Sequence, residues 1–187
     1  MKDLFENWRS FLLAEGLSDY NVSGVVRLFH YSKSEDESIV LDPEYFLNKR
    51  HSYSRKDYQA SDLPRVFFYA NLDHAEEMVK QGATLYTVLV PVEEIYDLVQ
   101  DRLGLIKKSI VPGRVTPNVD LILRSLAGVP RQSKYGPPPE LILSDDQRHS
   151  GAFYKTGNMD VVVWFKEIEV KRFDPENVET GVDNEEG

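Results

Sequence analysis

The sequence contains no cysteine among its 187 residues. This absence excludes disulfide bonds, thiolate zinc sites and a cysteine nucleophile, and it fits a reducing cytosol. No apolar run approaches the ~20 residues that a membrane-spanning helix needs. The acidic residues Asp3 and Glu6 leave no apolar signal core at the start, so we expect no secretory signal. These absences together predict a cytoplasmic protein without a membrane partner.

Several motifs that bind nucleotides or metals are also missing. No G-x-G-x-x-G follows a predicted strand, no G-x-x-x-x-G-K-[ST] occurs and no G-x-S-x-G occurs. A Rossmann dinucleotide site, a P-loop and a nucleophile elbow are therefore excluded. The four histidines lack the i, i+4 spacing of a helical metal site, so we expect no metal.

Positive charge is in the minority, and the net charge is −9 from 22 Lys and Arg against 31 Asp and Glu. A chain this acidic is a poor general nucleic-acid binder, because phosphate contacts need clustered cations. Part of the acidic excess lies in residues 174–187, which contain almost nothing to bury. We predict a disordered acidic tail there. The length suits one domain with a proper core, and we expect a monomer.

Apolar and aromatic runs predict strands that outnumber the helices. A long polar connection covers residues 33–64, and an aromatic patch follows the polar loop near residue 149. Thr116 is the expected cap of its helix, with Pro117 in the first turn. The predicted strands cover 25–31, 65–71, 84–92 and 160–173, the last as one long strand or two joined strands. The predicted helices cover 72–82 and 116–128, with a short helix or turn over 93–104. This order indicates an α+β fold around a mixed or antiparallel sheet.

The N-terminal residues 3–15 carry apolar side chains at helical spacing, and Gly16 is a plausible stop. They predict an amphipathic helix packed on the domain. The short helix ending in "LAEG" also resembles the capsid-targeting leaders of internal proteins of large tailed phages, which are cut after a glutamate, here Glu15. The predicted organisation is a helix or leader over 1–16, one domain over 17–173 and the tail over 174–187.

Four motifs follow one another along the domain. They are "LFHYS", "VFFYANLDHAEEMV", "EEIYDL" and "GNMDVVVWF". This ordered set resembles the ADP-ribosyltransferase superfamily, in the branch with a His-Tyr-Glu-type triad. It is similar to poly(ADP-ribose) polymerase-type catalytic cores and to the ADP-ribosyltransferase domains of phage and plasmid polyvalent proteins. The resemblance covers residues 25–173 and implies a split mixed or antiparallel sheet with peripheral helices.

The resemblance also implies a site for NAD, as a substrate. His30 and Ser32 correspond to the residues that contact the adenosine-side ribose, and Tyr31 stands where the family has a glycine beside the ligand. Phe68 takes the tyrosine position if the segments align without a gap, and Tyr69 takes it after a shift of one residue. Asp160 corresponds to the catalytic acid. A carboxylate there would stabilise the cationic ribose as nicotinamide leaves, and would orient the acceptor.

Each of these residues also has a structural interpretation. His30 can be a hydrogen-bonding residue at a strand end, Phe68 can belong to the core, and Asp160 can cap a turn. The functional interpretation requires that His30, the aromatic strand and Asp160 converge around one dinucleotide. It also predicts that Asp160→Ala abolishes turnover and leaves the fold intact.

The function implied by the resemblance is an NAD-dependent mono-ADP-ribosyltransferase encoded by a phage. Its acceptor is a host protein or nucleic acid, in the host cytoplasm, and the protein is packaged in the virion if the leader interpretation holds. One alternative is an NAD glycohydrolase, in which water is the acceptor. Another is a non-catalytic protein that keeps the fold, either as a binding module for ADP-ribose-like ligands or as a structural phage component.

Overall fold

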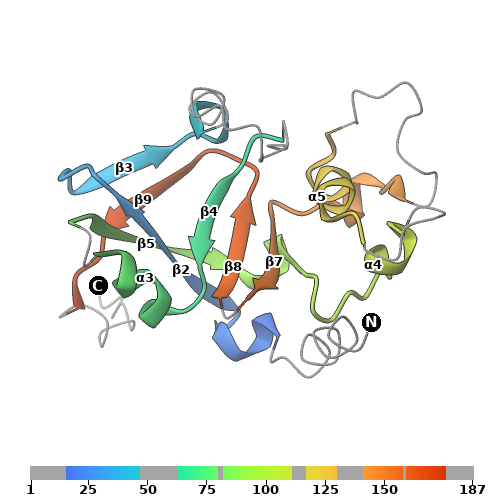
Figure 1. Ribbon diagram of the computed structural model, residues 1–187, viewed down its shortest axis with the longest axis horizontal. Helices are drawn as coiled ribbons and strands as arrows, with labels where there is room; N and C mark the ends of the chain where they lie inside the picture. Colours follow the sequence, from blue (N-terminus) through green and yellow to red (C-terminus); the bar gives the residue numbers. More distant parts are fainter. Residues whose placement is uncertain are drawn as a thin grey trace, which may run out of the picture.

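The computed structural model describes residues 16–46, 63–79, 82–110, 117–129, 141–157 and 159–175. They form an α+β fold around one mixed nine-stranded sheet (Figure 1). The strand order is β3-β9-β5-β2-β4-β8-β7-β6, and β1 pairs with β2 beside this path. The strands β6 and β7 are parallel, and the other pairs are antiparallel. The α+β prediction with a mixed sheet is therefore confirmed.

The elements have the following bounds. The strands are β1 (Asn21–Val22), β2 (Val25–Ser32), β3 (Ser38–Leu41), β4 (Val66–Tyr69), β5 (Thr84–Pro91), β6 (Ile95–Asp97), β7 (Gly151–Thr156), β8 (Met159–Trp164) and β9 (Ile168–Arg172). The helices are α3 (Leu72–Val79), α4 (Leu105–Lys108) and α5 (Val119–Ala127), with the 3-10 helices η1 (Leu17–Tyr20), η2 (Val92–Glu94) and η4 (Asp145–Gln147).

Most of the predicted elements are present. The strands expected over 25–31, 65–71 and 84–92 are β2, β4 and β5. The long segment 160–173 forms two strands, β8 and β9, so the second of the two open alternatives is correct. The helix α5 begins after Asn118, whose side chain accepts a hydrogen bond from the backbone N–H of Leu121. The prediction of Thr116 as the cap, with Pro117 in the first turn, is therefore wrong, because the cap is Asn118 and Pro117 precedes it.

Four strands were missed, β1, β3, β6 and β7. The helix or turn expected over 93–104 is wrong in part, because Ile95–Asp97 pairs with β7 as a parallel strand. Pairing with a strand more than 50 residues away leaves no local signal, and a three-residue strand has almost no periodicity to read. Similarly, β3 lies inside the predicted long connection, where it pairs with β9.

Among the neighbouring strands of the sheet, β2 and β4 share the fewest paired residues. The strand β2 pairs with β5 along its whole length, from Val25 opposite Pro91 to Ser32 opposite Thr84. With β4 it shares only the pair Phe29 and Tyr69. Beyond this pair the two strands separate, so the last residues of β2 have no backbone partner on β4. The junction between β2 and β4 divides the sheet into two well-paired halves.

Different residues pack against the two faces of the sheet where β2 meets β4. Successive side chains of a strand point to opposite faces. Phe29 and Leu85 pack with Ala75 of α3 on one face. On the other face Leu28 and Phe68 belong to the main core. A second core lies where the leucines of α5 contact β6 and β7.

Two further predictions fall outside the described residues. These are the helix or leader over 1–16, of which only Gly16 is described, and the tail over 174–187 beyond residue 175. Within the described ranges, no helix has the length and apolar character needed to cross a bilayer.

Candidate functional site

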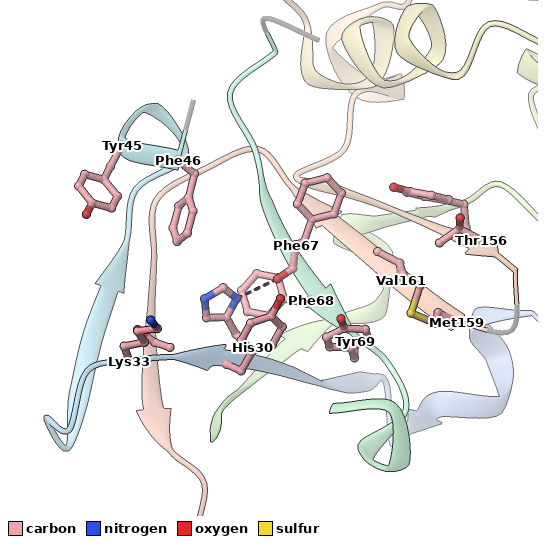
Figure 2. A pocket seen from close by; sticks show the side chains of 13 residues that line it. His30, Lys33, Tyr45, Phe46, Phe67, Phe68, Tyr69, Thr156, Met159 and Val161 are labelled. Atoms are coloured by element: carbon pink, nitrogen blue, oxygen red, sulfur yellow. Dashed lines mark hydrogen bonds between the residues drawn. The ribbon is translucent and has the colours of Figure 1, made fainter. Parts of the chain in front are cut away.

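A cavity of about 760 Å³ opens where β2 and β4 separate. Its volume lies within the range of small-molecule and cofactor sites. Side chains reach it from the end of β2, from the helical residues 43–46, from β4 and from the β7–β8 hairpin (Figure 2). The lining residues are His30, Tyr31, Ser32, Lys33, Tyr45, Phe46, Phe67, Phe68, Tyr69, Tyr154, Thr156, Met159 and Val161.

Five of the six predicted site residues line this one cavity: His30, Tyr31, Ser32, Phe68 and Tyr69. The first three end β2 and the last two end β4, so segments almost 40 residues apart meet here through the pairing of Phe29 with Tyr69. Their convergence is a result of the fold, and their role in ligand binding stays a prediction.

His30 fills the opening between the two strands. The residue is 8% exposed, and its Nδ1 lies 2.9 Å from the carbonyl oxygen of Phe67 (Figure 2). Burial lowers the pKa of His30, and this effect outweighs the hydrogen bond, which raises it. The neutral ring therefore donates from Nδ1–H to the carbonyl oxygen, which leaves Nε2 as an acceptor.

Aromatic rings form most of the remaining wall. The His30 and Tyr31 rings are stacked with centroids 5.9 Å apart, and those of Tyr31 and Tyr69 are stacked 6.1 Å apart. Burial, with a smaller contribution from Tyr31, raises the pKa of Tyr69. Phe68 is fully buried, so Tyr69 is the more accessible of the two candidates for the family's tyrosine position. Such a wall suits a planar heterocyclic ligand.

Asp160 lies away from this cavity. Its neighbours Met159 and Val161 both line the cavity, so the carboxylate projects from the opposite face of β8. It is 7% exposed, and it accepts a hydrogen bond from the Tyr20 hydroxyl. Lys155, its cross-strand partner on β7, places Nζ 3.3 Å from Oδ1. The convergence that the transferase interpretation requires is thus present for β2 and β4 and absent for Asp160.

No family model, curated protein or solved structure matches the chain.

The described lining residues include no Asp or Glu, and Lys33 is the one charged side chain among them apart from the titratable His30. Within the described ranges, no group of three or more His, Asp or Glu side chains is arranged to hold a metal ion. The side chains that line the cavity can accept hydrogen bonds from a ligand, contact its flat rings and attract an anionic group.

The sequence interpretation missed the contribution of the β7–β8 hairpin. Tyr154 and Thr156 reach the cavity from β7, and Met159 and Val161 reach it from β8. The sequence "GAFYKT" contains the signal, because alternate residues of a strand share a face, but its aromatic residues alone do not predict a strand. No sequence motif indicated that Lys33, Tyr45 and Phe46 would line the cavity.

Proposed function

We propose that the protein binds NAD in the cavity between β2 and β4, and that the activity to test on the bound NAD is mono-ADP-ribosyl transfer to a host protein or nucleic acid. This is the activity of the phage and plasmid polyvalent domains that the sequence resembles. The observation that supports the proposal is the gathering of the predicted residues of β2 and β4 around one cavity of suitable size.

Binding follows from the chemistry of the wall. The free Nε2 of His30 accepts a hydrogen bond from a ribose hydroxyl. The Ser32 hydroxyl accepts from the backbone N–H of Ser34 at 3.2 Å and still has its own proton to donate. The Tyr31 and Tyr69 rings line the cavity, where a nicotinamide or adenine ring could contact them. A dinucleotide contains all of these partners in one molecule.

Transfer makes a further demand. The bond between the nicotinamide nitrogen and the ribose C1 breaks, nicotinamide leaves with the bonding electrons, and an acceptor nucleophile bonds to C1 and loses a proton. A carboxylate beside C1 would stabilise the cationic ribose. Asp160 is instead paired with Tyr20 and Lys155 on the other face of β8. Binding without transfer is therefore the second candidate function, and the position of Asp160 favours it.

A thermal-shift titration with NAD tests binding. A ligand that binds only the folded state at 100 times its dissociation constant adds about 2.7 kcal/mol of stability. Tyr31→Ala should reduce the shift, because Tyr31 is 37% exposed on the cavity wall and its loss should not disturb the core. Leu89→Ala is the matched control, since Leu89 is exposed on β5 outside the cavity.

Incubation with adenylate-labelled NAD then separates the functions. Label on a macromolecule supports transfer, free labelled ADP-ribose supports hydrolysis, and a thermal shift with intact NAD supports binding alone. The absence of any shift with NAD or ADP-ribose would refute the proposal as a whole.

A further inference from the structure

The cavity has an unusual charge for this protein. The whole chain has a net charge of −9. In contrast, Lys33 brings a positive charge to the described cavity lining, which contains no carboxylate. A cation in a partly enclosed apolar site attracts anions more strongly than one on an open surface, because low-dielectric walls focus its field. The described lining therefore offers an anionic ligand a cation and no carboxylate, although the chain as a whole is acidic.

Lys33 is also available to a ligand. Its side chain is exposed, and none of the described carboxylates lies within ion-pair distance of it. Two acidic residues of the same turn have contacts of their own. Asp36 accepts a hydrogen bond from the Ser34 hydroxyl, and Glu37 pairs with Arg172 at 3.8 Å.

The turn that carries Lys33 is held in place by the core. The hydroxyl of Tyr86, a residue with no exposed surface, donates to the carbonyl oxygens of Ser34 at 3.1 Å and Asp36 at 2.8 Å. The Ser32 hydroxyl accepts from the Ser34 N–H on the other side of Lys33. The backbone of Lys33 is thus fixed, and only its flexible side chain must be ordered on binding, which limits the entropy cost.

Lys33 lies next to the groups that would hold a sugar. Figure 2 shows Lys33 at the end of the cavity near His30 and Phe46, with Thr156 and Met159 at the other end. We infer that Lys33 contacts a phosphate of the ligand beside the ribose hydroxyls held by His30 and Ser32, so that the cavity selects phosphate-bearing nucleotides over nucleosides. This inference rests on the proposed nucleotide binding and adds the residue that determines ligand charge.

Calorimetric titration of the full chain tests the inference with NAD, ADP-ribose, AMP and adenosine as ligands. Lys33→Ala should weaken the three phosphate-bearing ligands by about tenfold, the value expected for one charge-assisted hydrogen bond. Its affinity for adenosine should stay at the wild-type value. Lys33→Arg should retain most of the affinity for the phosphate-bearing ligands. Lys166→Ala, which removes an exposed lysine outside the cavity, is the charge-matched control.

Ionic strength provides a second readout. Raising the salt concentration should weaken wild-type binding of ADP-ribose and should affect Lys33→Ala less, because salt screens an exposed charge pair. Unchanged ADP-ribose affinity in Lys33→Ala would overturn the inference while nucleotide binding stands. An equal loss for adenosine would also overturn it, since that result indicates a structural role. Failure of the wild-type protein to bind any of the ligands would refute the proposed function itself.

Discussion

Replacing Asp160 separates the catalytic interpretation of this residue from the structural one. The resemblance to ADP-ribosyltransferases predicts that Asp160→Ala abolishes turnover and leaves the fold intact. The structure predicts a different result, because the Asp160 side chain is 10% exposed and satisfies two partners on the face of β8 opposite the cavity. We expect Asp160→Ala to destabilise the protein and to leave its affinity for NAD unchanged.

The size of the loss follows from the two contacts. Removing one member of a buried ion pair costs about 3–5 kcal/mol, but Lys155 is 23% exposed and can regain water, so its share is smaller. The Tyr20 hydroxyl loses an acceptor, which costs about 1–3 kcal/mol. We expect a total loss of about 2–4 kcal/mol, and since each kcal/mol lowers Tm by about 2–4 °C at this chain length, a Tm lower by about 4–16 °C.

Urea unfolding measures this loss, with the slope m required to stay constant. Asp160→Asn is the matched variant, because the amide keeps the size and an acceptor for Tyr20 while it loses the charge opposite Lys155; its loss should be smaller. Tyr20→Phe and Asp160→Ala should show coupling in a double-mutant cycle, with a combined loss below the sum of the single losses. Wild-type stability of Asp160→Ala together with abolished NAD turnover would refute this reasoning and restore the catalytic role.

Three further predictions concern other parts of the structure. Gly151→Ala should destabilise the protein by about 1–3 kcal/mol in urea unfolding, because a Cβ there would lie 2.7 Å from Trp164 Cε3 and 2.8 Å from the Val163 carbonyl oxygen; wild-type stability would contradict the tight packing. The lowered pKa of His30 means that the unfolded state takes up a proton near pH 6.5 before the folded state does, so stability should fall as the pH decreases below 6.5. His30→Asn, which keeps a donor for the Phe67 carbonyl and does not titrate, should make this decrease smaller in unfolding titrations at pH 7 and 5. Phe68→Ala should cost about 3–5 kcal/mol because the ring is fully buried, so an unchanged Tm would contradict its place in the core.

Local patterns were enough to locate the strand ends that form the cavity. The runs that became β2 and β4 are short, aromatic and β-branched, and each ends in a polar turn. The polar and aromatic side chains therefore lie at the ends of these two strands, whichever strands they pair with. The ordered motifs and the resemblance they carry selected residues 30–32 and Tyr69 on these strands, and the structure places these residues around one cavity.

The contribution of β7 and of Lys33 could not be selected in the same way. β7 lines the cavity only because it pairs with β8 in register from Gly151 opposite Trp164 to Thr156 opposite Met159. Lys33 follows β2 as one of many exposed lysines, and nothing in its neighbours indicates that a helix at residues 43–46 and the strand β4 enclose the same space.

The sequence by itself determined the α+β class, the main strands and the residues that each strand presents at its end, because these depend on periodicity and composition within a few residues. The tertiary structure alone decided which face of β8 carries Asp160. A strand alternates its side chains, so the face is set by register against β4 and β7 rather than by the motif. That register turns Val161 toward the cavity and Asp160 toward Tyr20 and Lys155.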